Sequence, residues 1–425
     1  MLSEDPVARG MGGNAIRALE LARVLSAHAA VTLASPAADD YELGDIERAA
    51  FDREDPRRLR SLLRGTDVVL ALPAGPVVAR ELLRSGARVI YDLYDPKPLQ
   101  VLEAFATASA FRRRYWARLA LDHVLAALCS GDHLICASER QRDLWIGAML
   151  ALGLITPATY ASDPDLRGLI DVVPFGVPTH APAGDADAPF ERFPGLSRPA
   201  QLVLWNGGLW NWLDPVSAVE AIARVVVDRP EARLVFMGPA PLEPSQAAAA
   251  REASAKAQQL GILDRIVFFN GERVPYDERD AWLLAADCAL SLHLEHLETR
   301  FSFRTRLLDC FWASLPVVCT HGDELAERVA GDGLGATVPA GDVSAAADAI
   351  VAVLAAGRDG YRDAFGRVVS DYRWPQVAAP LLRFIADGAS ARRRRARPTA
   401  PAALRLRAGG TRLARAGLRA MRRLS

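Results

Sequence analysis

The 425-residue sequence has little cysteine, only two lysines (Lys97 and Lys256) and no long apolar run. Its five cysteines (129, 136, 288, 310 and 319) lack metal-ligand spacing, so they are predicted to be small buried side chains in a reducing compartment. No hydrophobic stretch reaches transmembrane length, and no signal-peptide pattern opens the sequence. A cysteine-based metal site and a membrane-spanning protein are therefore excluded, and we expect a cytoplasmic protein.

Acidic residues are absent from residues 391–425, which contain twelve arginines. The rest of the chain holds the other 39 basic residues against all 51 acidic ones, so the zero net charge hides an asymmetry. Leucines interspersed with the arginines fit an amphipathic helix on the anionic inner face of a membrane. A solvated, disordered basic tail is the equal alternative. Nucleic acid is not expected as a partner, because the tail has no aromatic residue for base stacking.

The length exceeds the usual size of one hydrophobic core, so two domains are expected. Strand patterns alternate with helix patterns throughout both halves, which indicates parallel sheets of Rossmann type. The predicted class is α/β, with two doubly wound domains facing a cleft. The predicted parts are an acceptor-side domain (1–178), a Pro/Ala/Gly/Asp-rich linker (179–199), a second domain (200–374), a closing helix (375–390) and the basic tail (391–425).

The first strand of the N-terminal domain is nearly absent. Leu2-Ser3 has the pattern of a strand end, and a glycine-rich loop, a helix over 14–26 and a strand over 31–34 follow. We therefore expect either that translation starts further upstream or that the first sheet lacks a strand. Gly12 and Gly13 are a candidate phosphate-binding loop, since backbone approaches a ligand closely where no side chain intervenes.

Polar residues follow two strands of this domain at the sheet edge where ligands bind. Asp92 and Asp95 follow the strand over 88–91, and they are candidates to orient an acceptor hydroxyl or act as a base. A strand-end turn and helix cap is the equal alternative. After the strand over 133–137, Ser138 is predicted to cap a helix, with Glu139 and Arg140 as weaker candidates for substrate contact.

The stretch from Ser291 to Thr320 is the strongest candidate for a phosphate-binding site in the second domain. A buried strand over 288–292 leads into a polar loop, and a helix is predicted to begin near residues 303–305. A helix N-terminus carries partial positive charge and suits a phosphate. Arginines at 300, 304 and 306 flank that end and can grip phosphate oxygens in pairs, and a solvated arginine-rich helix start is the alternative.

This stretch resembles retaining glycosyltransferases of family 4, which have the GT-B fold and a Glu-x7-Glu motif, E-x-F-G-x-x-x-x-E-A-x-A-x-G-x-P-V-V. Here the aligned residues are F-S-F-R-T-R-L-L-D-C-F-W-A-S-L-P-V-V. Asp309 falls on the second Glu, Phe303 on the Phe and Pro316 on the Pro. Phe301 stands where the first Glu belongs and Arg304 replaces a Gly, so Glu298, three residues upstream, is the candidate first carboxylate.

The loop at 205–214 departs from the family. Its members carry G-R-L-x-x-x-K-G here, with Arg and Lys on the donor pyrophosphate, whereas this chain has Gly208 and Leu213 at those positions. The resemblance implies that the arginines of the 300–306 stretch replace the lost pair or that the donor is held differently. Trp205 is predicted to pack in the core, while Trp210 and Trp212 are candidates to stack on a sugar or base.

The family resemblance spans about residues 8 to 385 and implies transfer of a sugar from a nucleotide-sugar donor to an acceptor hydroxyl with retention, without a metal or other cofactor. The acceptor would be a glycan or lipid-linked molecule of cell-envelope synthesis. The implied catalytic carboxylates are Glu298 and Asp309, with Asp309 on the ribose. The implied donor-binding residues are Gly12, Gly13, Gly207, Gly208, Arg300, Arg304, Thr305, Arg306 and Glu324 (or Glu327).

Two other functions stay open. One is a GT-B shell that binds a nucleotide but has lost catalysis, as the missing Arg, Lys and first Glu would suggest. The other is a sugar-nucleotide epimerase on the same fold. A dinucleotide-dependent oxidoreductase is disfavoured, because no G-x-G-x-x-G follows a strand.

Overall fold

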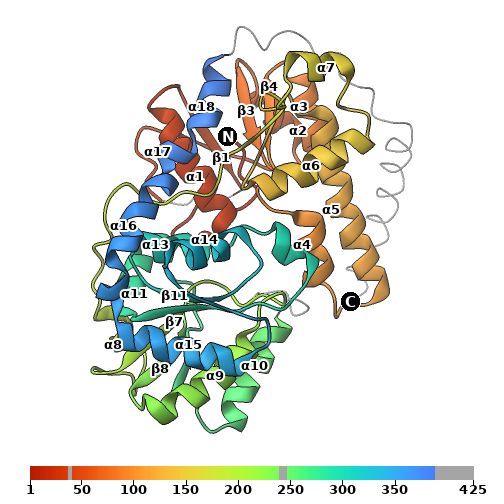
Figure 1. The fold of residues 1–425 in the computed structure, drawn as a ribbon. Coiled ribbons are helices and arrows are strands. Elements are labelled where there is room, and N and C mark those ends of the chain that lie inside the picture. Colours follow the sequence, from red (N-terminus) through yellow and green to blue (C-terminus); the bar gives the residue numbers. More distant parts are fainter. Residues whose placement is uncertain (37–40, 239–246, 388–425) are drawn as a thin grey trace. The chain divides into compact units, whose positions relative to one another are not determined.

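The computed structural model describes residues 1–36, 41–238 and 247–387. The chain divides into two compact units (Figure 1). Unit 1 comprises Met1–Pro174 together with the chain from Val377 onward, and unit 2 is Phe175–Gln376. The predicted basic tail, 391–425, lies outside the described residues.

Unit 1 is built on parallel strands, as the alternating pattern predicts. The strands are β1 (Thr32–Ser35), β2 (Glu47–Ala50), β3 (Val68–Ala71), β4 (Arg88–Asp92), β5 (His133–Cys136) and β6 (Ile170–Val172). β1 pairs with β2, and the other four form a sheet in the order β3-β4-β5-β6. β2 is not predicted, because its sequence, Glu-Arg-Ala-Ala, is neither apolar nor alternating.

Residues 1–3 lie between β1 and β3 and take the place of the missing first strand. Leu2 forms parallel bridges with both Ala34 and Ala71. Its N–H donates to the Leu70 carbonyl at 2.9 Å, and the Ser3 N–H donates to the Ala34 carbonyl at 2.8 Å. The two sets of strands are thus joined through one bridged residue, in agreement with the expectation that no full strand is built from residues 1–4.

The helices of unit 1 are α1 (Gly13–Ser26), α2 (Pro56–Leu62), α3 (Pro76–Arg84), α4 (Lys97–Ala104), α5 (Ala110–Ser130), α6 (Glu139–Ala151), α7 (Pro157–Ser162) and α18 (Ala379–Ala386). Ser138 caps α6, where its side chain accepts from the Gln141 N–H, which confirms the predicted cap. α18 brings the end of the described chain back to this unit: Phe384 stacks on His133 with ring centroids 4.0 Å apart. The sheet therefore carries helices from both ends of the sequence.

Unit 2 contains one six-stranded parallel sheet. Its order is β12-β11-β10-β7-β8-β9. The strands are β7 (Gln201–Trp205), β8 (Ala232–Phe236), β9 (Val267–Phe269), β10 (Cys288–Ser291), β11 (Val317–Thr320) and β12 (Gly335–Val338). β10 and β11 are buried along their whole length. The order of the strands along the sheet reverses between β7 and β10. Open α/β sheets bind ligands at such a point, at the carboxyl ends of their strands.

The helices of unit 2 are α8 (Ala188–Glu191), α9 (Pro215–Asp228), α10 (Ala248–Gln259), α11 (Arg279–Ala285), α12 (Leu297–Phe301), α13 (Arg306–Trp312), α14 (Glu324–Asp332), α15 (Val343–Ala356), α16 (Arg362–Val368) and α17 (Trp374–Val377), with short 3-10 turns at Tyr276–Glu278, Arg358–Tyr361 and Val369–Tyr372. The loop predicted after β10 thus contains α12, and the helix predicted from 303–305 begins at Arg306. The segment predicted as linker packs within unit 2, where the His180 carbonyl accepts from Trp312 Nε1 at 2.7 Å.

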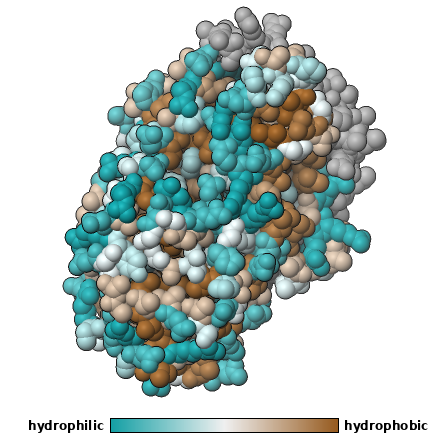
Figure 2. Space-filling model, in the orientation of Figure 1, coloured by the Kyte–Doolittle hydropathy of each residue, from teal (hydrophilic) through white to brown (hydrophobic). Residues whose placement is uncertain are grey.

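Apolar side chains from both faces of each sheet form the cores. Trp205 is fully buried against Phe236, as predicted, whereas Trp210 and Trp212 stack on each other at 5.2 Å. Four cysteines are buried, and burial raises the pKa of each of their thiols, while Cys129 is half-buried. The face drawn in Figure 2 intermixes hydrophilic and hydrophobic residues. None of the helices in the described part of the chain is long and apolar enough to cross a membrane.

Candidate functional site

The loop after β7 is the first part of the candidate site in unit 2. Gly207 has φ +107°, a conformation open mainly to glycine. The loop after β8 comes so close that a Cβ on Gly238 would lie 2.4 Å from the Gly207 carbonyl oxygen. Asn206 Nδ2 donates to the Arg306 carbonyl at 2.7 Å, which ties this loop to the start of α13. The backbone of Gly207 and Gly208 is thus held at the carboxyl edge of the sheet, next to the side chains of Arg306 and Trp210.

Arg306 supplies the charge at this loop. Its Nη2 donates to the Gly208 carbonyl at 3.0 Å, and its guanidinium lies over the Trp205 ring, 5.5 Å from the centroid. Among the described residues it forms no ion pair with a carboxylate, and its buried Nη1 has no hydrogen-bond partner. Burial, followed by repulsion from Arg304, lowers the pKa of Arg306 to about 9. The group is still cationic at neutral pH, so it is a charge for which the described chain offers no counter-ion.

Arg304 is placed differently from Arg306, although both are predicted to bind a diphosphate. Its guanidinium meets the Glu298 carboxylate with two hydrogen bonds, at 2.7 and 3.3 Å. Both side chains are buried. This bidentate pair is neutral as a unit, and it fixes α12 against the segment that leads into α13. The predicted roles of Glu298 in catalysis and of Arg304 at the diphosphate stay predictions, and each side chain is the partner of the other.

The other predicted donor residues of unit 2 lie around this pair. Arg300 is exposed on α12, over the Phe301 ring, and Thr305 directly precedes α13. Asp309 is partly exposed on α13 and accepts from Arg279 Nε at 3.1 Å. Glu324 begins α14, whose first N–H groups are capped by Asp323. Asp309 is therefore linked to α11, away from the Glu298–Arg304 pair.

The buried His293 and the partly exposed His296 extend the polar cluster, and their roles are not predicted from the sequence. His293 Nε2 lies 3.5 Å from Asp323 Oδ2, and both residues are about 1% exposed. His296 Nε2 lies 3.0 Å from the Trp212 carbonyl, and His296 Nδ1 lies 3.8 Å from Glu298 Oε2. These contacts connect the loops after β7, β10 and β11, so they hold the donor-side loops in register.

In unit 1 the central feature is a second buried ion pair. Arg17 of α1 binds Asp92 at the end of β4 through Nε–Oδ2 and Nη2–Oδ1, at 2.5 and 3.1 Å. It also donates to the carbonyls of Val173 and Pro174 at 2.8 and 2.7 Å. Asp92, predicted to act on the acceptor, thus has a cation of its own. Arg17 was not predicted, because its position in α1 looks like any polar face of a helix.

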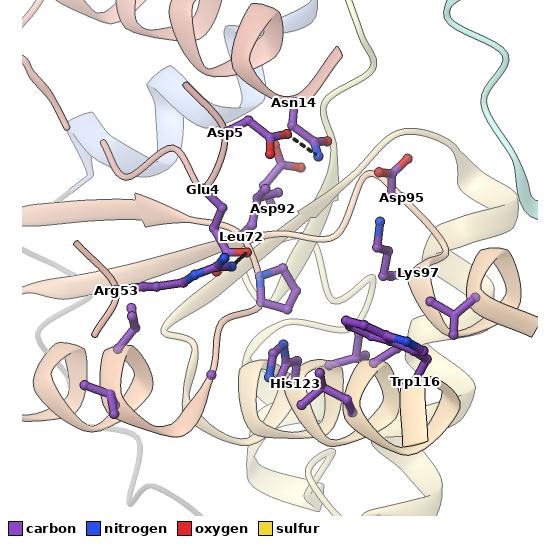
Figure 3. Close-up of a pocket in the computed structure, with 18 of the residues that line it drawn as sticks. Glu4, Asp5, Asn14, Arg53, Leu72, Asp92, Asp95, Lys97, Trp116 and His123 are labelled. Carbon is purple, nitrogen blue, oxygen red and sulfur yellow. Dashed lines mark hydrogen bonds and ion pairs between the residues drawn. The ribbon is translucent and has the colours of Figure 1, made fainter. Parts of the chain in front are cut away.

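A cavity of about 670 Å³ opens beside this pair, wholly within unit 1 (Figure 3). One side is polar and carries Asp5, Asn14, Asp92 and Asp95 from the start of α1 and the end of β4. The opposite side is formed by α3 and α5. Its lining residues include Gly75, Val77, Val78, Tyr115, Trp116, Leu119, Ala120, His123 and Val124. Its volume lies in the range of about 300–1,000 Å³ that small-molecule sites occupy.

The remaining predicted residues of unit 1 divide between the cavity and the outer surface. Asp95 lines the cavity and accepts from Gln100 Nε2 at 3.1 Å. Gly12 and Gly13 begin α1, where a Cβ on Gly13 would lie 3.3 Å from the Tyr94 hydroxyl. Glu139 is exposed and bound to Arg167 at 2.6 Å, and neither it nor Arg140 lines the cavity. The structure therefore groups Asp92 and Asp95 and leaves Glu139 apart.

Within the described ranges, no three His, Cys, Asp or Glu side chains gather closely enough to hold a metal ion. The arrangement itself offers charges and hydrogen-bonding groups. Unit 2 presents bare backbone and an unpaired guanidinium, and unit 1 presents carboxylates next to aromatic and apolar side chains.

Comparisons with known proteins agree with this architecture. Residues 200–356 match the family described as "Glycosyl transferases group 1". No curated protein matches the sequence. Among solved structures, sucrose-phosphate synthase (tll1590) from Thermosynechococcus elongatus is 17% identical, with a TM-score of 0.64 over 92% of this chain and 98% of that one.

Two further structures are similar over nearly their whole length. WaaG, a glycosyltransferase involved in lipopolysaccharide biosynthesis, is 15% identical with a TM-score of 0.61, covering 91% of this chain and 99% of that one. Anabaena Alr3699/HepE, in complex with UDP and glucose, is 14% identical with a TM-score of 0.63, covering 91% and 98%. The chain therefore has the GT-B fold of these glycosyltransferases, and its unit 2 carries a glycosyl transferases group 1 domain.

Proposed function

We propose that this chain transfers a sugar from a nucleotide-sugar donor to an acceptor hydroxyl with retention of anomeric configuration and without a metal ion, as members of family 4 do. The observation that carries the proposal is the Arg306 guanidinium, held at the Gly207–Gly208 loop of the group 1 domain without a carboxylate partner. An unpaired buried cation is costly, and an anion next to it would relieve that cost.

The chemistry of transfer needs positive charge at this position. As the glycosidic bond to the donor breaks, the leaving diphosphate gains negative charge, and fixed cations and N–H groups aimed at it favour that state. Arg306 would meet the diphosphate directly. Glu298 would hold Arg304 in place next to Arg306 rather than touch the sugar itself, because both of its oxygens are bound to that guanidinium. Asp309 would accept bonds from the ribose.

A role in making cell-envelope glycans, at the inner face of the membrane, is part of the same proposal. It is supported by the similarity to WaaG, whose title names lipopolysaccharide biosynthesis. The similarity to HepE in complex with UDP-glucose makes UDP the first nucleotide to test.

The test is thermal unfolding with UDP, GDP and ADP, on the native chain and on Arg306→Met. A ligand at a hundred times its dissociation constant stabilises a protein by roughly 2.7 kcal/mol. We expect one nucleoside diphosphate to raise the melting temperature, and Arg306→Met to weaken its binding about 10- to 100-fold, because a charged hydrogen bond contributes about 1.5–3 kcal/mol. Without ligand, the variant should be no less stable than the native protein, since it loses an unpaired charge.

Arg224→Met is the matched control, because Arg224 is exposed on α9, forms no ion pair within the described part of the chain and lies outside the site. The nucleotide that binds determines which nucleotide-sugar donors are used in the transfer assay. NMR then gives the anomeric configuration of the product. Stabilisation by no nucleoside diphosphate would contradict the proposal. Binding without turnover would favour an inactive nucleotide-binding shell, and turnover without any acceptor would favour an epimerase.

A further inference from the structure

The unit 1 cavity has two chemically different walls, and this inference, which rests on the proposed function, concerns the molecule that would fit between them. On the polar wall, Asp5 accepts from Asn14 Nδ2 at 3.1 Å. A carboxylate has about four acceptor positions, so this one bond leaves Asp5 able to accept from hydroxyl groups. Asn14 adds an amide oxygen on the same wall, and both residues point into the space drawn in Figure 3.

The facing wall is built around Trp116. Phe105 stacks on one face of its indole, with centroids 5.2 Å apart and planes within 10°. Phe105 does not line the cavity, whereas Trp116 and Tyr115 do, and Tyr115 meets Trp116 edge-on at 5.3 Å. The indole is thus supported from behind and fixed in orientation. A rigid aromatic surface opposite carboxylate and amide groups suits a sugar ring, which has apolar C–H faces and a polar rim.

Apart from His123, the rest of that wall is apolar. Val77, Val78, Val101, Leu119 and Val124 line it, from α3, α4 and α5. None of these side chains can bond a hydroxyl, so this part of the cavity favours an apolar group. The occupant that satisfies both walls is therefore amphiphilic, with a hydroxylated ring on one side and an apolar portion on the other.

The charges of the residues that line the cavity narrow the class of ligand further. The lining contains five carboxylates, those of Glu4, Asp5, Glu54, Asp92 and Asp95, against Arg53 and Lys97. Arg17 neutralises Asp92 from outside the lining, and Arg53 lies 4.0 Å from Glu4. Among the lining residues themselves, five carboxylates face two basic side chains, and this excess of acidic groups disfavours an anionic ligand.

We infer that this cavity binds the acceptor, and that the acceptor is an uncharged or amine-bearing sugar attached to an apolar group, not a phosphorylated sugar. The sugar ring lies against Trp116, and its hydroxyl groups donate to Asp5 and Asp95. The apolar portion lies along α3 and α5.

The experiment is isothermal titration of the full chain with octyl glucoside, octyl galactoside and octyl glucosaminide below their micellar concentrations, and with glucose 6-phosphate. We expect at least one octyl glycoside to bind and glucose 6-phosphate not to bind. Trp116→Leu and Asp5→Asn should each weaken octyl glycoside binding about tenfold, the scale of one aromatic or hydrogen-bonded contact. Asp143→Asn is the matched control, because Asp143 is exposed on α6 and does not line the cavity.

Nucleoside diphosphate binding, measured on the same variants, separates this inference from the proposed function. All three variants should keep the nucleotide-induced rise in melting temperature, which also shows that they are folded. If the nucleotide binds but no octyl glycoside does, or if glucose 6-phosphate binds more tightly, the inference is overturned and the proposed function stands. Equal octyl glycoside affinity in Trp116→Leu and Asp143→Asn would likewise overturn it. If no nucleotide binds, the proposed function fails first.

Discussion

The two units carry opposite charge at their candidate sites. In unit 2, the Gly207–Gly208 loop faces Arg306, a cation without a carboxylate partner among the described residues. In unit 1, carboxylates outnumber cations around the cavity. Both sites lie at the carboxyl ends of parallel strands, so the fold alone does not distinguish them.

This contrast suits a reaction with two unlike substrates. A nucleotide-sugar donor carries a diphosphate, and the unit 1 cavity repels that charge while unit 2 attracts it. An uncharged acceptor gains nothing from Arg306 and fits the amphiphilic walls of unit 1. Under the proposed function, electrostatics would keep the donor out of the unit 1 cavity, whereas the acceptor would favour unit 1 because of its apolar wall.

The largest expected effect is the loss of stability on breaking the buried ion pair that each unit contains. Arg17→Met would leave Asp92 buried without its cation and would also remove the bonds to Val173 and Pro174. Arg304→Met would leave Glu298 in the same state, with fewer lost bonds. Breaking a buried pair costs about 3–5 kcal/mol, and we expect Arg17→Met to be the more damaging change.

Urea unfolding of the two variants measures these costs. The exposed arginines Arg64 in unit 1 and Arg224 in unit 2 provide matched Met controls, which should change the unfolding free energy by no more than about 0.5 kcal/mol. A loss in either pair variant no greater than in its control would show that the pair is solvated and does not hold its two segments together.

Much of the fold could be predicted because single strands carry local signals. β7 (Gln201–Trp205) is an apolar run between a proline and an Asn-Gly pair, a pattern that indicates a buried strand. β2 (Glu47–Ala50) pairs only with β1 and lacks a buried face, so it leaves no such signal. The general rule is that buried strands can be recognised from sequence and exposed edge strands cannot.

The sites were less predictable, because they depend on which distant side chains meet. Arg304 and Arg306 look equivalent in sequence. The non-helical residues 302–305 between α12 and α13, however, place Arg304 on Glu298 and leave Arg306 at the Gly208 carbonyl. Trp116 of α5 looks like an ordinary core aromatic. Only the packing of α4 and α5 turns it toward the cavity that Asp95 lines from the end of β4.

A smaller effect tests the charge contrast between the sites directly. Raising NaCl from about 50 to about 500 mM should weaken nucleoside diphosphate binding several-fold, because salt screens the attraction between Arg306 and the diphosphate. Binding of octyl glucoside or octyl galactoside, which carry no charge, should stay unchanged or strengthen slightly. Titration calorimetry of both ligands at the two salt concentrations makes the comparison within one protein. Equal salt dependence for the two ligands would mean that the sites do not differ in charge as described.

The smallest expected effect is a change in stability on replacing Glu4, which lines the cavity. Burial raises the pKa of Glu4, against the opposing pull of Arg53 and together with repulsion from Asp5. Because the folded-state pKa lies above the unfolded value, stability is greatest while Glu4 is protonated, and part of it is lost as pH rises through the folded pKa. Glu4→Gln keeps the shape without the charge, so it should raise the unfolding free energy at pH 7 by at most about 1 kcal/mol.

The decisive measurement is how the difference in unfolding free energy between Glu4→Gln and the native chain depends on pH. The gap between Glu4→Gln and the native chain should close at low pH, where the native carboxyl is protonated and resembles the amide. Glu42→Gln, at an exposed position, should show no gap at either pH. If Glu4→Gln is instead less stable than the native chain at pH 7, the Arg53 ion pair outweighs burial at Glu4. Glu4 would then stay ionised down to a lower pH, and the negative charge that disfavours a phosphorylated acceptor would persist over a wider pH range.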